Sequence, residues 1–411
     1  MGYKYFMKKI LLLCRVVDNY GDIGFVYRLS RSLSELYPED YELTLAVSNL
    51  DSFSKLCPSV SPDKSIQKCC GWNILDWNAS EKASGFISKN FPDVILECFQ
   101  CGRPEWLDEL LFDSENRKCL IVNVEYLTAE EWADDFHLLK SGTRSSSVKK
   151  INFMPGFTDK TGGLVLDSSF TENLSSASAA LNKIEGLIPQ ESFSAIKTSS
   201  DFNVLVFNYK RDFSVLAAAL EKFSAVIKKN VRIFAAPGLS FDSVVEAAAG
   251  LSHVKIQKLP YMCQTSWDAL LCLMDFNFIR GEDSFSRAAL CGKPFVWDIY
   301  PQEGQFHLVK LEAFLLRLKP YFSDGQLFKR FRRFVLGYNL KLHDEICSEA
   351  LDAVTPEEYK CLEDKDFAVN ELLYLFDEYS ALKDAFSEFA GAAVSNGNLT
   401  VHLNEVLKNY F

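Results

Sequence analysis

The sequence predicts two consecutive α/β domains, each a doubly wound parallel sheet covered by helices. Short runs of β-branched and aliphatic residues alternate with helix-patterned stretches, as they do where helices connect parallel strands. A segment rich in Ser, Thr and Ala, residues 167–200, has no long apolar run and is interpreted as the bridge between two series of strands. The length of 411 residues also fits two domains.

The individual elements follow from the same patterns. In the first series we expect strands at Lys9–Val17, Glu42–Ser48, Asp93–Glu97 and Leu120–Glu125, and helices at Phe25–Leu36 and Pro104–Leu111. In the second series we expect strands at Asn203–Asn208, Val231–Ala235, His253–Gln257, Phe276–Ile279 and Pro294–Ile299. A helix over Phe213–Lys229 would bury Leu216, Leu220, Phe223 and Val226 on one face.

The chain after about Leu316 is helical in pattern, and its last helix, Leu399–Phe411, could pack on either domain. We therefore expect an N-terminal domain over 1–182, a C-terminal domain over 183–385, and a helical segment over 386–411 that could pack back on the N-terminal domain.

Composition and charge exclude several classes of function. The 44 Lys and Arg residues against 55 Asp and Glu residues give a net charge of −11. This balance argues against general binding to nucleic acid or to an anionic membrane, because both need a cationic surface. The apolar run Ile10–Cys14 is too short for a membrane helix, and no signal-peptide cleavage site follows it. A cytoplasmic, reducing location is expected.

The 12 cysteines form no readable disulfide framework, and the pair Cys69 and Cys70 is adjacent. Cys98 and Cys101 form a single CxxC motif, which is a weak metal signal without a second pair and is more typical of two buried or loop thiols. We expect no metal and no cofactor. His137 has no readable partner for nucleophilic catalysis, and neither does His307, so structural roles are favoured for both.

The first loop that could carry chemistry is Val17–Gly24, between the first strand and the first helix. Gly21 and Gly24 allow a tight turn and a close approach to a ligand. Asp18 and Asp22 could orient or deprotonate a nucleophile. Equally, Asp22 could be a helix N-cap and Asp18 a turn residue.

The second loop is Phe278–Phe285, where a strand runs into a glycine turn and a helix. Arg280, the Ser284 hydroxyl and the free N–H groups of a helix N-terminus are suited to a diphosphate. Glu282 and Asp283 would repel that group unless they bind sugar hydroxyls or cap the helix. A plain capping sequence with a surface arginine is the alternative.

Aromatic residues follow two strands of the second series, and they could stack on a nucleobase or belong to the core. They are Phe207, Tyr209 and Tyr261. The glycine-rich stretch Pro155–Gly163 resembles a phosphate loop without the Walker spacing, and a cleft-lining or interdomain loop fits it equally well.

Five blocks of the sequence resemble bacterial protein-arginine rhamnosyltransferases that modify elongation factor P. They extend from the first strand to about Phe314, and the stretch from RGEDSF to IYPQ is the most specific. The blocks are Cys14–Gly24, Val124–Trp132, Met154–Leu164, Arg280–Phe285 and Gly292–Gln302.

The resemblance implies a GT-B fold, in which two Rossmann-like domains face each other across a cleft. It also implies that the enzyme inverts the anomeric carbon of TDP-β-L-rhamnose without a metal, with elongation factor P as the protein acceptor. By match to the family motifs, Asp22 would be the catalytic carboxylate, Asp18 would support it or bind the acceptor, and activity would depend on Glu282. The residues that would contact the donor are Tyr20, Gly21, Phe207, Tyr209, Tyr261, Gln264, Arg280, Asp283 and Ser284.

Some positions depart from the family pattern. The family often has Phe at the positions of Tyr20 and Tyr261, and Pro at the position of Cys263. Asp298 stands where a histidine is common, so no histidine role is carried over to that position.

The chemistry agrees with a carboxylate pair. A guanidinium has a pKa of about 12.5–13.8, so a neutral nucleophile is almost absent at neutral pH and carboxylates must assist. Two alternatives stay open: a GT-B transferase with a different donor or acceptor, and a catalytically silent nucleotide-sugar binding module.

Overall fold

The computed structural model describes residues 7–17, 20–113, 117–341 and 344–410. The chain divides into two compact units. Unit 1 comprises Met1–Asp167 and Asn396–Phe411, and unit 2 comprises Ser168–Ser395. The expected boundaries at 182 and 385 therefore differ from this division, because residues 168–182 and 386–395 lie in unit 2.

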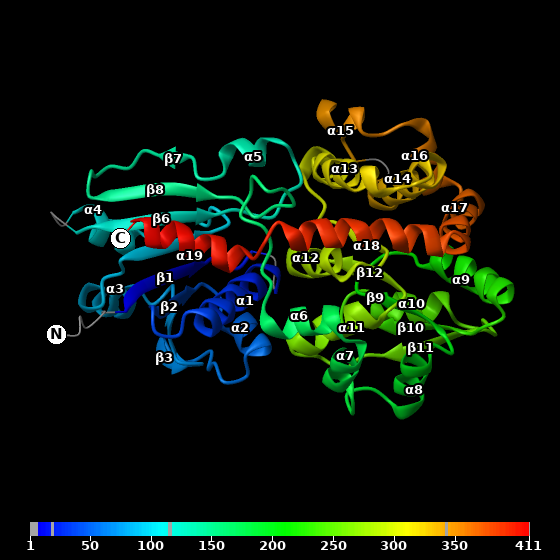
Figure 1. Ribbon diagram of the computed structural model, residues 1–411, viewed down its shortest axis with the longest axis horizontal. Coiled ribbons are helices and arrows are strands. Elements are labelled where there is room, and N and C mark those ends of the chain that lie inside the picture. Colours follow the sequence, from blue (N-terminus) through cyan, green and yellow to red (C-terminus); the bar gives the residue numbers. More distant parts are fainter. Residues whose placement is uncertain (1–6, 18–19, 114–116, 342–343, 411) are drawn as a thin grey trace. The chain divides into compact units, whose positions relative to one another are not determined.

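Unit 1 contains an eight-stranded sheet with the order β3-β4-β2-β1-β5-β6-β8-β7 (Figure 1). The six inner strands are parallel to one another, and β3 and β7 pair antiparallel at the two edges. The strands are β1 (Lys8–Cys14), β2 (Tyr41–Val47), β3 (Ile66–Cys69), β4 (Trp72–Asp76), β5 (Val94–Cys98), β6 (Cys119–Val124), β7 (Lys140–Ser141) and β8 (Val148–Phe153).

The central strand β1 shows why this sheet forms. Its residues Ile10 and Leu12 enter one apolar core and Leu11 and Leu13 enter the other, and none of the four is more than 1% exposed. Both faces of the sheet are therefore covered, as a parallel sheet with helical crossovers requires. The covering helices are α1 (Gly21–Leu36), α2 (Leu50–Leu56), α3 (Ser80–Lys89), α4 (Glu105–Phe112) and α5 (Trp132–Phe136).

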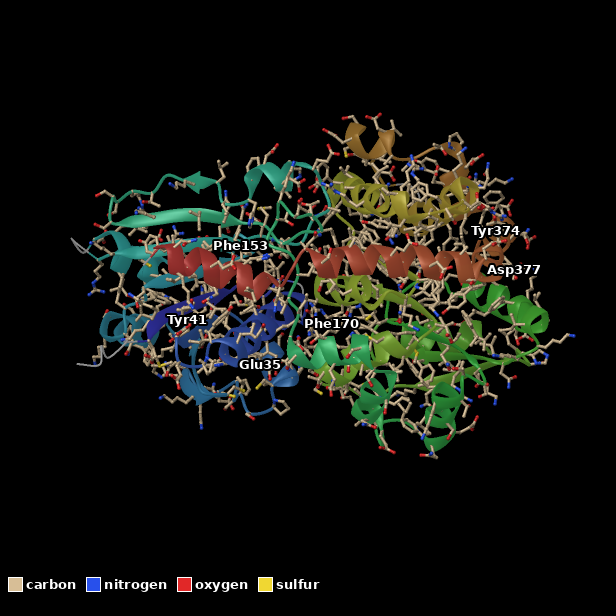
Figure 2. All side chains as sticks on the ribbon, viewed as in Figure 1. Glu35, Tyr41, Phe153, Phe170, Tyr374 and Asp377 are labelled. Carbon is tan, nitrogen blue, oxygen red and sulfur yellow. The ribbon has the colours of Figure 1, made fainter. Side chains whose placement is uncertain are left out.

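The C-terminal helix α19 (Leu399–Tyr410) belongs to unit 1. Leu399, Leu403 and Leu407 are fully buried in the same apolar core as α1. The Tyr41 hydroxyl on β2 donates a hydrogen bond to Asn404 Oδ1 at 2.7 Å (Figure 2). The last helix of the chain thus completes the first domain.

Unit 2 contains a five-stranded, wholly parallel sheet with the order β11-β10-β9-β12-β13. Its strands are β9 (Phe202–Val206), β10 (Val231–Ala235), β11 (Val254–Lys258), β12 (Phe276–Arg280) and β13 (Phe295–Asp298). Its α-helices are α6 (Ser168–Ser175), α7 (Ala177–Ile184), α8 (Gln190–Thr198), α9 (Ser214–Ile227), α10 (Phe241–Ala247), α11 (Gln264–Leu273), α12 (Glu282–Cys291), α13 (His307–Leu318), α14 (Gly325–Asn339), α15 (Ser348–Asp352), α16 (Pro356–Glu363), α17 (Lys365–Asp377) and α18 (Tyr379–Ser395).

Two expectations about unit 2 were wrong. Residues 167–200 were expected to form a bridge, but they contain the helices α6, α7 and α8. Each of these helices buries an apolar side chain: Phe170 on α6, Ile184 on α7 and Phe193 on α8. Because these residues are widely spaced, they form no continuous apolar run in the sequence. Val226 was expected on the buried face of α9, yet it is 61% exposed. Its position around the helix axis is rotated away from that of Leu216, so its side chain leaves the buried face.

The sheet of unit 1 also has strands that the sequence did not reveal: β3, β4, β7 and β8. The edge strand β3 contains Lys68 and the inner strand β8 contains Lys149 and Lys150, and these lysines break the apolar pattern. The helical character expected after Leu316 is confirmed by the elements from α14 to α19. Among the described residues, no helix is long and apolar enough to cross a membrane.

The strand orders fix where ligands can bind. In each unit the chain first forms a central strand, adds strands on one side of it, and then adds strands on its other side. This change of side falls between β1 and β5 in unit 1 and between β9 and β12 in unit 2. Ligands of doubly wound sheets bind outside the carboxyl ends of the strands at such switch points. The residues that follow these four strands are therefore the candidates for function.

Candidate functional site

Asp22 lies at the switch point of unit 1, in the first turn of α1. Its side chain is 2% exposed. Asp22 Oδ2 accepts a hydrogen bond from the Val17 N–H at 2.7 Å, and Oδ1 accepts one from the Tyr126 hydroxyl at 2.9 Å. Tyr20 is the N-cap residue of α1, so the interpretation of Asp22 as the N-cap was wrong. A buried carboxylate is thus held by the loops that follow β1 and β6.

An aromatic stack positions the hydroxyl that contacts Asp22. The Tyr126 ring stacks on Phe99, with 4.2 Å between ring centroids and 12° between the planes. Phe99 follows β5 and contacts Phe25 on α1, with ring centroids 5.1 Å apart. Sequence reasoning missed Tyr126, although it lies within the block Val124–Trp132 that carried part of the resemblance. These rings join α1 and the loops that follow β5 and β6 around one carboxylate.

The other residues predicted in the first loop lie near Asp22 in the chain. Gly21 is the first residue of α1, and Tyr20 precedes it with 37% of its surface exposed. Asp18 lies outside the described residues, so its predicted role is carried only by the sequence.

Arg280 lies at the switch point of unit 2, at the end of β12. Its guanidinium carbon is 4.7 Å from the ring centroid of Phe207 and 4.7 Å from that of Tyr209, both of which follow β9. Two aromatic faces therefore hold the cation by cation–π attraction. Arg280 Nε is buried and has no hydrogen-bond partner among the described residues. This nitrogen is a donor available to an anionic ligand.

Gly281 connects Arg280 to the N-terminus of α12. Its φ of +79° lies in the left-handed region that favours glycine, and no atom lies within 4 Å of where a Cβ would stand. Open space therefore adjoins the turn. The N-terminal N–H groups of α12 carry partial positive charge, which attracts phosphate oxygens.

The first three residues of α12 make contacts with two other helices, α13 and α11. Glu282 Oε1 accepts from Lys310 Nζ on α13 at 2.7 Å, whereas Glu282 Oε2 is buried without a hydrogen-bond partner among the described residues. Asp283 Oδ2 accepts from Gln264 Nε2 at 3.3 Å. Ser284 Oγ accepts from the Trp267 indole N–H at 3.2 Å, and the Trp267 ring contacts Phe207 with centroids 5.1 Å apart.

The structure thus brings most of the predicted donor residues together in unit 2. They are Phe207, Tyr209, Gln264, Arg280, Asp283 and Ser284, and Glu282, which was predicted as a catalytic residue, lies beside them on α12. Tyr261 differs from them, because it is 82% exposed and makes no ring contact with Phe207 among the described residues. Neither Trp267 nor Lys310 had a signal in the sequence.

Asp298, at the position where the family often has histidine, orders the loop that carries Tyr209. It is 3% exposed, and its Oδ2 accepts from Asn208 Nδ2 at 3.1 Å and from the Tyr209 N–H at 3.0 Å. Arg211 Nη1 lies 3.3 Å from Asp298 Oδ1. A carboxylate therefore fixes the backbone behind Tyr209.

The remaining candidates have structural contacts. Burial lowers the pKa of His137 to about 4, with a further contribution from His402, and His137 Nδ1 accepts from the Met154 N–H at 3.1 Å. Burial also lowers the pKa of His307, whose Nδ1 accepts from the Gln302 N–H at 3.2 Å. The structural roles favoured for both histidines fit these contacts.

The glycine-rich stretch Pro155–Gly163 packs within unit 1. Asn396 Nδ2 donates to the Phe157 carbonyl at 2.5 Å, and a Cβ at Gly163 would lie 2.7 Å from the Gly397 carbonyl oxygen. Close approach to the Gly397 backbone therefore explains Gly163, whereas a Cβ at Gly156 or Gly162 would meet the side chain of Thr161 or Phe153.

A cavity of about 750 Å³ lies elsewhere in unit 1, beside β8 and α19. Its lining includes Lys140, Arg144, Lys150 and Tyr410, and it contains none of the predicted site residues. We assign the candidate site from the switch points instead, because the hydrogen-bonded carboxylate of Asp22 and the guanidinium of Arg280 are there.

Comparison with known proteins agrees with the fold and the motifs. The model of the family "Elongation-Factor P (EF-P) rhamnosyltransferase EarP" matches residues 10–405. A protein-arginine rhamnosyltransferase of Shewanella oneidensis is 35% identical over 74% of this chain and 79% of its own length. One of Pseudomonas aeruginosa is 31% identical over 80% and 86%.

Solved structures show the same fold. A structure described as the basis for EarP-mediated arginine glycosylation of translation elongation factor EF-P has a TM-score of 0.55 at 17% identity, covering 98% of this chain and 99% of that one. The spinosyn rhamnosyltransferase SpnG complexed with thymidine diphosphate has a TM-score of 0.50 at 12% identity, covering 97% and 100%. The predicted GT-B fold class is confirmed. The chain is therefore a member of the EarP family of elongation factor P rhamnosyltransferases.

Proposed function

We propose that this protein transfers rhamnose from TDP-β-L-rhamnose to an arginine side chain of elongation factor P, with inversion at the anomeric carbon and without a metal. The observation that carries the proposal is Asp22, a buried carboxylate held from two sides at the switch point of unit 1. The names of the relatives, and the acceptor named for the family and for the EarP structure, support the same reaction. A translation factor as acceptor places the reaction in the cytoplasm.

The donor would bind in unit 2. The diphosphate would lie at the N-terminus of α12, within reach of Arg280 and the Ser284 hydroxyl. The base would lie near Phe207, Tyr209, Tyr261 and Gln264. Arg280, the Ser284 hydroxyl and the dipole of α12 would stabilise the negative charge that develops on departing TDP. A metal ion performs this task in other transferases.

The acceptor guanidinium would bind at Asp22. Its N–H groups would donate to the carboxylate oxygens, with Asp18 assisting, and the carboxylate would take one proton as the nitrogen attacks the anomeric carbon. The bond between that carbon and the diphosphate oxygen breaks in the same displacement, and the electron pair leaves with TDP. Because attack occurs opposite the leaving group, the anomeric configuration inverts.

Glu282 would act on the sugar. One of its oxygens is paired with Lys310, and the other is buried without a partner among the described residues. A buried acceptor without a partner is costly. A sugar hydroxyl that donates to Glu282 Oε2 would remove this cost and orient the rhamnose ring.

The test is incubation of the purified chain with TDP-rhamnose and elongation factor P, followed by intact mass measurement and peptide mapping. We expect one rhamnose-sized increment on one arginine, and its rate should fall about 10²–10⁴-fold in Asp22→Asn, because the general base is lost. Asp51→Asn replaces an exposed carboxylate on α2 and should retain full activity.

The alternatives give different results. Tight TDP binding without any increment would favour a silent binding module, and an increment that needs another nucleotide sugar or another acceptor would favour altered specificity. Brief exposure to EDTA should leave the rate unchanged. A complete loss that Mg²⁺ alone restores would contradict the metal-free mechanism.

A further inference from the structure

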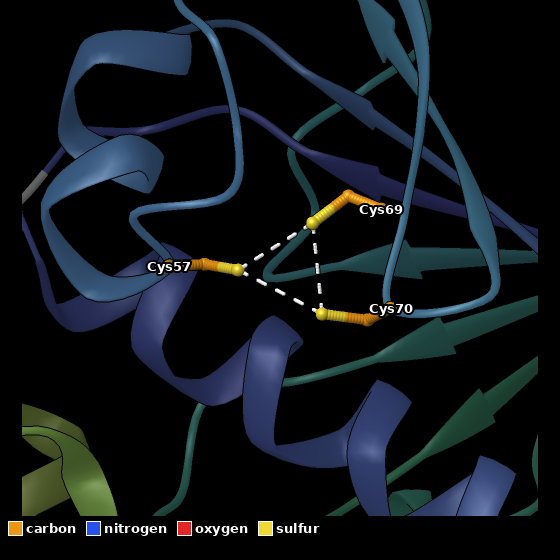
Figure 3. A group of neighbouring side chains, drawn as sticks. All are labelled: Cys57, Cys69 and Cys70. Carbon is orange, nitrogen blue, oxygen red and sulfur yellow. Dashed lines mark hydrogen bonds between the residues drawn. The ribbon is translucent and has the colours of Figure 1, made fainter.

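Three thiols in unit 1 converge on one point. Cys57 Sγ lies 3.7 Å from Cys69 Sγ and 3.7 Å from Cys70 Sγ, and the last two sulfur atoms lie 3.6 Å apart (Figure 3). Among the described residues, this is the one group of three or more His, Cys, Asp or Glu side chains whose ligand atoms gather in this way. It lies apart from the residues proposed for catalysis.

The backbone is arranged to bring adjacent cysteines together. Cys69 ends β3 and pairs with Trp72 of β4, so Cys70 and Gly71 form the two-residue turn of a hairpin. Both have positive φ, +55° and +82°. Such turns favour Asn and Gly, and a cysteine there is uncommon. Adjacent strand residues normally point to opposite faces, whereas here the turn directs both sulfur atoms to Cys57.

The distances fit a tetrahedral ion. With Zn–S bonds of about 2.3 Å, the sulfur atoms of a tetrahedron lie about 3.8 Å apart. The three observed separations of 3.6–3.7 Å agree with that edge. They are far longer than the S–S bond of about 2.0 Å in a disulfide.

The surroundings suit a soft cation. Cys57 is 4% exposed and Cys69 is 6% exposed, while Cys70 is exposed and leaves a path for entry. Burial raises the pKa of the Cys69 thiol to about 12, with contributions from Cys70 and Cys57. A thiophilic ion binds cysteine side chains as thiolates and displaces their protons.

Tyr27 of α1 adjoins the same sulfur atoms. Burial raises its pKa and the proximity of Cys57 raises it further. Its ring contacts Phe53 of α2 and Trp72 of β4, with centroids 5.5 Å and 5.9 Å away. The three thiols therefore lie where α1, α2 and the β3–β4 hairpin meet.

We propose that Cys57, Cys69 and Cys70 bind one Zn²⁺ ion at a structural site, with water or the Tyr27 oxygen as the fourth ligand. The ion joins α2 to the hairpin at the edge of the sheet, where β3 has a neighbour on one side only and Ile66 is 40% exposed. No metal was expected from the sequence, in which Cys98 and Cys101 formed the one weak metal motif, and folding alone brings Cys57 to Cys69 and Cys70.

The test is metal binding by the full-length chain, fully reduced and freed of metal. Titration with Co²⁺ should give one equivalent of a species with thiolate-to-metal charge-transfer absorption and intense tetrahedral d–d bands, and Zn²⁺ should displace it. Cys70→Ser, at an exposed position that should not prevent folding, should weaken Co²⁺ binding at least about tenfold, as expected when a metal site is damaged. Cys347→Ser should bind as the unmodified chain does.

A second thiol pair controls for binding elsewhere. Cys272 Sγ and Cys291 Sγ lie 3.0 Å apart in unit 2. Loss of the cobalt spectrum in Cys272→Ser, or equal binding by the unmodified chain and Cys70→Ser, would overturn the proposal. So would an isolated protein that contains a Cys57–Cys69 or Cys57–Cys70 disulfide and takes up no metal after reduction. Transferase activity enters none of these measurements, so the result is independent of the proposed reaction.

Discussion

Arg280 illustrates how single residues combine charge and shape. Its guanidinium lies between two aromatic rings at the end of β12, and its Nε is buried without a partner among the described residues. A planar cation can stack on both rings and still present N–H groups to a phosphate, whereas an ammonium group cannot do both. The geometry therefore favours arginine over lysine for reasons beyond charge.

Arg280→Lys tests this at the scale of one side chain. The change keeps the positive charge and removes the planar stacking, so we expect the dissociation constant for TDP to rise about tenfold. Isothermal titration calorimetry measures it. Arg144→Lys, whose side chain is 70% exposed, is the control and should bind TDP as the unmodified chain does. Equal affinities for all three proteins would contradict the assignment of Arg280 to the donor.

His137 makes a prediction about pH. Burial lowers its folded-state pKa from 6.5 to about 4. Below pH 6.5 the unfolded chain binds a proton that the folded chain excludes, so stability that is present above pH 6.5 is lost as the pH falls towards 4. His137→Asn offers an oxygen to the Met154 N–H and does not titrate. We expect its free energy of unfolding in urea to decrease less between pH 7.5 and pH 5 than that of the unmodified chain, and identical decreases would refute the role of His137.

At the scale of elements, burial of its apolar side chains shows that α19 is part of the core of unit 1. Leu403 lies on α19, fully buried in the core of unit 1, although almost the whole of unit 2 separates it from the rest of that core in the sequence. Val226 on α9 is an aliphatic residue of a helix too, but it is 61% exposed. Both residues fit a helical pattern, and tertiary packing alone separates them.

Leu403→Ala should therefore lower the free energy of unfolding by about 2–5 kcal/mol, through lost transfer energy and a residual cavity. Val226→Ala should change it by no more than about 0.5 kcal/mol. Urea unfolding monitored by circular dichroism measures both. Similar effects of the two substitutions would show that α19 is not an integral part of the core.

At the scale of the whole molecule, the two units are not two successive halves of the chain. Unit 2 is one continuous stretch, Ser168–Ser395, and contains every residue proposed to bind the donor except Tyr20 and Gly21. Unit 1 is built from two stretches, because Asn396–Phe411 returns to it. The stability of unit 1 thus depends on residues that follow unit 2 in the chain.

A chain that ends at Ser395 separates the two units experimentally. Without Leu399, Leu403 and Leu407, unit 1 should lose its protection against hydrogen exchange, since its core is left open. The affinity for TDP should fall by less than about tenfold, because the donor residues of unit 2 remain. If the truncated chain lost TDP binding as well as the hydrogen-exchange protection of unit 1, the division of roles between the units would be contradicted.

Much of this organisation was predictable. Strands such as Val231–Ala235 were located correctly, because apolar runs covered on both faces give a strong pattern, and the tail was correctly expected to be helical. The strands β3, β7 and β8 were missed because lysines and other polar residues interrupt their apolar pattern. Strand β4 is mostly buried, and it was missed because Asn73 interrupts its short apolar run. The positions of Asp22 and Arg280 near the carboxyl ends of central strands were predictable, since Asp22 lies in the first turn of the helix after β1 and Arg280 is the last residue of β12.

The sequence by itself determined the fold class, the family and the loops that carry the carboxylate and the anion-binding residues, because local patterns and family motifs are written in consecutive residues. Only the tertiary structure decided which distant residues meet them: Tyr126 at Asp22, Lys310 at Glu282, and Cys57 at Cys69 and Cys70. The physical reason is that these contacts depend on strand order and helix packing, which bring together residues far apart in the chain. A side chain's partner is a property of the folded molecule.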